Sequence, residues 1–190
     1  MELLKLFIKS AIVDNVVFIQ YLAICPFIGM TSETGKAAGM GLATSFVILL
    51  ATAVTWPLYQ FVMVPLGLRF LQTLFFILVI ASLVQLVEFY LKKSAPGLYS
   101  SMGVYLALIT TNCAVLGVTI NCIGKDFNYI ESIIYALGAA AGFLLSMVIM
   151  SGVRNRMKIA NIPAAFQGTP ILYVAAGLLS LAFMGFKGLL

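Results

Sequence analysis

Three cysteines are the residues of this sequence best suited to chemistry. They are Cys25, Cys113 and Cys122, in a chain of 190 residues that has no histidine to ligate haem or zinc. Cys25 and Cys113 each begin a short motif, "CPFIGM" and "CAVLG", of the shared form C-x-x-[IL]-G. Because a cysteine thiolate binds metal ions, the first candidate chemistry is metal ligation by Cys25 and Cys113.

Local sequence places both of these cysteines at helix starts. Pro26 follows Cys25, and proline is favoured at the first position of a helix, so we expect a half-helix to begin just after Cys25. The run "TTN" at 110–112 consists of helix N-cap residue types and predicts a second half-helix that begins near Cys113. The free N–H groups of a helix start favour an anion, and therefore favour the thiolate form.

The number of cysteines limits the kind of site. An iron–sulfur cluster usually takes four cysteine thiolates, and only Cys25 and Cys113 are related by motif, so two further ligands must come from another chain. Cys122 follows Asn121 near the opposite end of the same apolar segment, and we interpret it as structural. Because free cysteine often behaves as a small buried apolar residue, a packing role for all three stays open.

Composition decides the class of protein. The chain is 63% hydrophobic and 9% charged, with a mean hydropathy of +1.12, which indicates an all-α integral membrane protein. Six apolar segments predict six transmembrane helices in a single domain over residues 1–190: 7–25, 38–63, 70–91, 102–123, 129–152 and 170–189. The short connections leave no room for a soluble catalytic domain, so any chemistry happens at membrane depth or in partner subunits. No basic cluster indicates nucleic-acid binding.

The six segments divide into two halves of three, about 1–95 and 96–190. The two C-x-x-[IL]-G motifs align between the halves, and so do "GMGLATSF" and "ALGAAAGF" further along. Because three is an odd number, the copies enter the membrane from opposite sides, as in inverted-repeat transport proteins. We therefore expect two inverted three-helix repeats, with the first and fourth helices broken near Cys25 and Cys113.

The basic residues indicate the orientation only through two segments, "LKKSAPG" and "RNRMK", which concentrate charge beside helix ends. Loops rich in lysine and arginine remain on the cytoplasmic side. This rule predicts a multi-pass protein of the bacterial cytoplasmic (inner) membrane with both termini on the outer face.

At these residues the sequence resembles a known family, the RnfA family of Rnf-complex membrane proteins, together with the homologous membrane pair of the sodium-pumping NADH:quinone reductase. The resemblance covers essentially the whole chain. The motifs that carry it are "CPFIGM" at 25–30, "GMGLATSF" at 39–46, "LITTNCAVLG" at 108–117, "IPAAFQG" at 162–168 and "SLAFMGFKG" at 180–188.

The resemblance implies a non-autonomous subunit of a redox-driven Na⁺ or H⁺ translocase that acts as a ferredoxin:NAD⁺ oxidoreductase. In that family, RnfA and its homologue RnfE have opposite orientations and jointly hold a 2Fe-2S cluster inside the bilayer. By position, Cys25 and Cys113 are this chain's two ligands, and the chain relays electrons. Flavins, other iron–sulfur centres and the sites for ferredoxin and NAD then belong to the other Rnf subunits, B, C, D and G among them.

Two other classes of function stay open. A membrane ion transporter without a redox centre would use Asp14, since an ionisable group in an apolar segment is costly and often functional. A purely structural scaffold would use Gly39, Gly41, Gly138 and Gly142 as small surfaces that let helices approach closely.

Overall fold

The computed structural model describes residues 2–66, 69–94, 109, 111–160, 163 and 166–188, and every regular element in this part of the chain is helical. The longer elements are α3 (Thr34–Leu58), α5 (Gln72–Ser94), α8 (Cys113–Gly124), α9 (Tyr129–Met157) and α10 (Thr169–Met184). The shorter ones are α1 (Glu2–Ile8), η1 (Lys9–Val13), α2 (Ile24–Met30), η2 (Tyr59–Met63), α4 (Val64–Leu66), η3 (Arg69–Leu71) and η6 (Gly185–Gly188).

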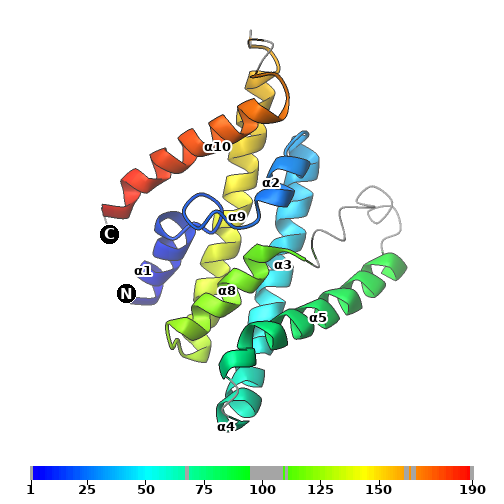
Figure 1. Ribbon diagram of the computed structural model, residues 1–190, viewed down its shortest axis with the longest axis vertical. Helices are drawn as coiled ribbons and strands as arrows, with labels where there is room; N and C mark the ends of the chain where they lie inside the picture. The colour runs from blue at the N-terminus through cyan, green and yellow to red at the C-terminus, as the bar shows by residue number, and fades with distance from the viewer. Residues whose placement is uncertain are drawn as a thin grey trace.

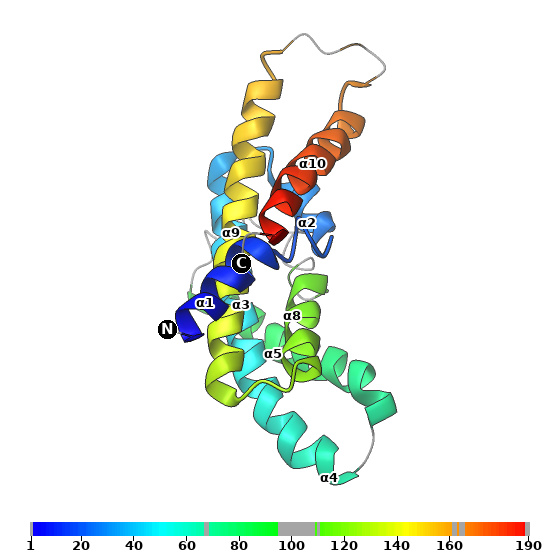
Figure 2. The ribbon, with the colours of Figure 1, turned by 90° about the vertical axis from the view of Figure 1, so that its left-hand side faces the viewer.

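Helices α3 and α9 form the centre of the molecule and run side by side along its long axis (Figures 1 and 2). They are antiparallel, because the hydroxyls of Thr34 and Ser151 meet at one end, at 3.2 Å. At the other end the indole Nε1 of Trp56 donates to the carbonyl oxygen of Phe127, at 2.9 Å. A buried helix pair that is apolar on nearly every side suits a membrane protein better than a soluble one.

Glycines let the other helices approach α9 closely. A Cβ atom at Gly138 would collide with Ser10 of η1, and one at Gly142 would lie 2.5 Å from the carbonyl oxygen of Ala11. A Cβ at Gly41 of α3 would lie 3.0 Å from Leu144. The prediction of close small-residue surfaces is confirmed at these three positions and is wrong at Gly39, which has no heavy atom of another part of the chain within 4 Å of that point.

Three of the described helical stretches are long and apolar enough to cross a membrane: Thr34–Met63, Gln72–Phe89 and Tyr129–Met157. Helices α8 and α10 are apolar but shorter. Predicted segments 38–63, 70–91, 129–152 and 170–189 each coincide with helix, and segment 7–25 is interrupted at residues 14–23. Much of predicted segment 102–123 before residue 109, and the predicted boundary between repeats near residue 95, lie outside the described residues.

A candidate site where two helix starts meet

Helix α8 begins at Cys113, as the "TTN" run predicts. Asn112 is its N-cap, with an extended backbone (φ −70°, ψ 113°), and its Oδ1 accepts a hydrogen bond from the backbone N–H of Ala114 at 3.0 Å. This is the expected use of asparagine at a helix start. Thr111 is exposed, while Thr110 lies outside the described residues.

Helix α2 begins at Ile24, one residue before Cys25, so the prediction of a start just after Cys25 is wrong by two residues. The physical reason is that several N–H groups in a helix's first turn have no partner within the helix, so Pro26 is accommodated at the third position as well as at the first. The N-cap, Ala23, has a left-handed backbone (φ 61°, ψ 32°) and offers no side-chain cap.

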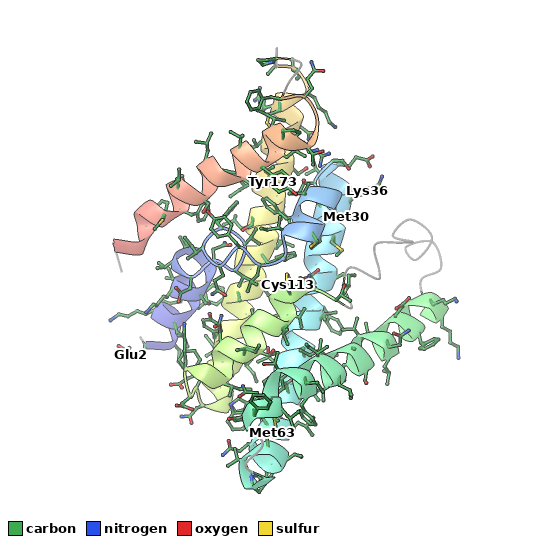
Figure 3. All side chains as sticks on the ribbon, in the orientation of Figure 1. Glu2, Met30, Lys36, Met63, Cys113 and Tyr173 are labelled. Atoms are coloured by element: carbon green, nitrogen blue, oxygen red, sulfur yellow. The ribbon has the colours of Figure 1, made fainter. Side chains whose placement is uncertain are left out.

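The two helix starts are joined by a direct hydrogen bond. The backbone N–H of Ala23, two residues before Cys25, donates to the Sγ atom of Cys113 at 2.8 Å. One turn further along α8, Gly117 leaves room for Leu22, whose side chain a Cβ at Gly117 would hit. Figure 3 places Cys113 near the middle of the long axis, where α8 meets the loop that leads to α2. Two motifs 88 residues apart in sequence therefore share one place in the fold.

The two thiols differ in burial. Cys25 is exposed and Cys113 is half-buried, while Cys122 is buried at 1% exposure with its Sγ 3.8 Å from the carbonyl oxygen of Ser132. The last observation fits the predicted structural role of Cys122. Cys25 is thus the cysteine that the chain itself leaves open.

A buried asparagine that our sequence reasoning did not identify as an anchor holds the loop before Cys25. Asn15 is fully buried, and its Nδ2 donates to the carbonyl oxygens of Ala11 and Gly142, each at 3.1 Å. Its Oδ1 accepts from the N–H groups of Val17 and Phe18 and from the hydroxyl of Ser146 on α9, as the distances of 3.0, 3.3 and 3.1 Å show. The only sequence signal is a polar residue beside Asp14 in an apolar run.

The same loop is fastened to α10. Ser180 donates from its hydroxyl to the carbonyl oxygen of Phe18 at 2.5 Å and lies 2.7 Å from the Tyr21 hydroxyl. The Phe18 ring also packs edge-on against Phe27 of α2 and, at 4.6 Å between centroids, against Phe183 of α10. Contacts from both α9 and α10 therefore fix the approach to Cys25.

The far end of α2 is held by the last turns of α9. Arg154 donates from Nη1 to the carbonyl oxygen of Ile28 at 2.9 Å and to the Thr31 hydroxyl at 3.4 Å. Lys158 donates from Nζ to the carbonyl oxygen of Ser32 at 3.0 Å. A cation at a helix C-terminus satisfies the last carbonyls and complements the helix dipole, so the "RNRMK" run braces the short helix that carries Cys25.

Asp14, the predicted ion-path residue, lies in an ion pair. Its carboxylate is 3.3 Å from the Lys125 ammonium group just beyond α8, and the two side chains are 23% and 42% exposed. Nearby, Asn121 donates from Nδ2 to the Gln20 Oε1 at 2.9 Å. These contacts tie the loop at 14–23 to the C-terminal end of α8, and they give Asp14 an ordinary structural partner.

Within the described part of the chain, no three His, Cys, Asp or Glu side chains gather as a metal site. A complete four-ligand site is therefore absent there, and Cys25 and Cys113 could supply at most part of one. One polar atom near them lacks a partner: the Asn112 Nδ2 is buried without a hydrogen bond.

Comparisons with known proteins agree with the earlier resemblance. The family model described as "Rnf-Nqr subunit, membrane protein" matches residues 3–190. A protein from Azoarcus sp. (strain BH72), named as the RnfA component of an ion-translocating oxidoreductase complex, is 50% identical over 99% of this chain and 97% of its own length. Proteins of the same name from Yersinia enterocolitica and Syntrophotalea carbinolica are 48% and 47% identical over the same shares.

Proposed function

Because the chain belongs to the Rnf-Nqr family of membrane subunits, we propose that it relays electrons through a 2Fe-2S cluster shared with a homologous, inverted partner subunit. Its relatives are subunits of ion-translocating oxidoreductase complexes, which makes this chain an Rnf-type membrane subunit. The proposal adds the cluster, its two ligands Cys25 and Cys113, and the reaction class, electron transfer between ferredoxin and NAD⁺ coupled to Na⁺ or H⁺ movement.

The observation that carries the proposal is the hydrogen bond from Ala23 N–H to Cys113 Sγ. It brings the segment that leads into Cys25 against the other cysteine, in a chain where Asn15, Ser180 and Arg154 fix that segment from three sides. A packing role for either cysteine would not require the two motifs to meet.

The residues present fit a shared cluster. Two thiols are one half of the usual set of four, and Cys25 is exposed, as a ligand that completes its site with another chain must be. Cys113 Sγ already accepts an N–H, which is the kind of donor that commonly surrounds cluster sulfurs. When bound, a 2Fe-2S cluster takes up and releases single electrons.

The architecture proposed with this function is six transmembrane helices in two inverted repeats of three. The antiparallel α3 and α9, the interruption at 14–23 and the start of α8 at mid-length support it. In this arrangement Cys113 lies near the membrane midplane, where discontinuous helices usually form the functional sites of inverted-repeat proteins. The "RNRMK" end of α9 then faces the cytoplasm of a bacterial cell, with both termini outside.

The test is iron, acid-labile sulfide and EPR of the reduced, anaerobically purified pair of this chain and its homologous partner. We expect a 2Fe-2S signal in the wild type that is lost in Cys25→Ala and in Cys113→Ala. Cys122→Ala is the matched control and keeps the signal, because its thiol lies apart from the two motifs. An iron-free wild-type pair would exclude the proposal.

The same assay separates the transporter alternative. Asp14→Asn keeps the iron and the EPR signal if this chain is a relay, since Asp14 pairs with Lys125 rather than with a cysteine. An autonomous transporter would instead lose ion movement in Asp14→Asn and lose nothing when the cysteines are replaced.

A further inference from the structure

Asn112 lies directly before Cys113, and half of its side-chain amide is unused. The residue is 5% exposed, and its Oδ1 accepts the Ala114 N–H. Since a backbone N–H only donates, the oxygen must face the helix start, and the amide nitrogen is the atom left over. That nitrogen has no hydrogen-bond partner in the described structure. Buried amide groups are nearly always paired, so this one calls for an acceptor that the chain alone does not supply.

Capping does not explain the amide nitrogen. Serine, threonine and aspartate cap helices about as well as asparagine, and none of them carries an NH₂ group. What asparagine adds at this position is two N–H donors in a buried place beside a thiol. A second donor already points at the same thiol, because Ala23 N–H is 2.8 Å from Cys113 Sγ. The unused donors therefore lie where sulfur is the nearest acceptor that the proposed function would provide.

We propose that the Asn112 Nδ2 donates a hydrogen bond to a sulfur atom of the cluster held by Cys25 and Cys113, and thereby raises the cluster's reduction potential. This inference rests on the proposed function. The added electron places more negative charge on the sulfur atoms, so an N–H donor stabilises the reduced form more than the oxidised form. Asn112 is then a positioning residue through its cap and a tuning residue through its nitrogen.

The test is an EPR-monitored redox titration of the purified pair with Asn112→Ser. Serine keeps a capping oxygen and removes the amide donor, so the cluster stays and its potential falls. We expect the ratio of reduced to oxidised cluster at a fixed potential to drop about tenfold, which is ~59 mV for a one-electron couple. Asn112→Asp keeps the cap at nearly the same size and puts a negative charge in place of the donor, so its potential falls further.

Asn121→Ser is the matched control, since Asn121 lies near the other end of α8 and pairs with Gln20. It leaves the potential unchanged. A wild-type potential in Asn112→Ser, with the cluster present, would overturn the inference while the proposed function stands. A wild-type pair without a cluster would overturn both.

A second readout needs no variant. In the wild-type pair labelled with ¹⁵N only in asparagine side chains, pulsed EPR of the reduced cluster should detect a weak ¹⁵N coupling. The side-chain label separates Asn112 from the backbone nitrogen of Ala23. If this coupling is absent, the nitrogen of Asn112 has its acceptor elsewhere, and the inference fails even if the variants do not assemble.

Discussion

The two cysteine-bearing helix starts share a motif but differ in how the chain supports them. Cys113 begins a twelve-residue helix, with a side-chain cap from Asn112 and with Gly117 covered by Leu22. Cys25 begins a seven-residue helix that has no side-chain cap, and Gly29, the counterpart of Gly117, has no heavy atom of another part of the chain within 4 Å of its added Cβ. The Cys113 start is built from local sequence, whereas the Cys25 start depends on distant contacts and remains open.

This difference gives the two halves different roles in a shared site. The covered half is set by the chain before any partner arrives, and the open half presents an exposed thiol to what lies outside. A cluster that bridges two subunits needs both kinds of surface. The predictions below test whether the Cys25 half really depends on its distant contacts.

The largest effect is expected at Asn15. Asn15→Leu removes every hydrogen bond of a fully buried amide and leaves at least three groups unpaired, at about 1 kcal/mol or more each, so we expect a loss of about 3 kcal/mol. Asn112→Ala removes one cap and should cost about 1 kcal/mol. Reversible unfolding in detergent measures both. Equal losses would show that the two starts are supported alike.

An intermediate effect is expected at Arg154. Arg154→Gln removes a charged donor from the Ile28 carbonyl at the end of α2, and we expect it to destabilise the chain by about 1.5 kcal/mol. Arg156→Gln, two residues on and exposed, should stay within about 0.5 kcal/mol of wild type. Thiol labelling should also show faster modification of Cys25, but not of Cys113, in Arg154→Gln. No change at Cys25 would remove Arg154 from the support of α2.

The smallest effect is expected at the paired glycines. Gly117→Ala makes the Leu22 side chain move, and we expect a cost of about 1 kcal/mol, since overpacking is felt even where a side chain can shift. Gly29→Ala meets open space within a helix, so it should be neutral or stabilising by up to about 1 kcal/mol. Thermal unfolding of the two variants side by side decides this. Similar losses at both positions would mean that Gly29 is as enclosed as Gly117.

Local signals predicted the Cys113 half better than the Cys25 half, for a physical reason. The cap at Asn112 and the start of α8 depend on neighbouring residues, which a single sequence displays. The left-handed Ala23, the contacts of Asn15 with Gly142 and Ser146, and the bond from Arg154 to Ile28 depend on residues more than 100 positions apart or on the backbone they impose. No local pattern encodes such contacts.

The predicted glycine surfaces show the same limit. Gly138 and Gly142 do lie against η1, but Gly39 was chosen by the same spacing argument and packs closely against nothing in the described part of the chain. Spacing identifies a helix face, while the neighbour of that face is decided by the whole fold. The predicted spans, by contrast, depend on composition over some twenty residues, and four of them coincide with helices.

The most direct test of the central claim is the iron and acid-labile sulfide content of this chain purified alone, compared with that of the assembled pair, both prepared without oxygen. A half-site with one covered and one open cysteine predicts no stable cluster on the chain alone and one 2Fe-2S cluster per pair. A full complement of iron and sulfide on the chain alone, or none on the pair, would contradict the account.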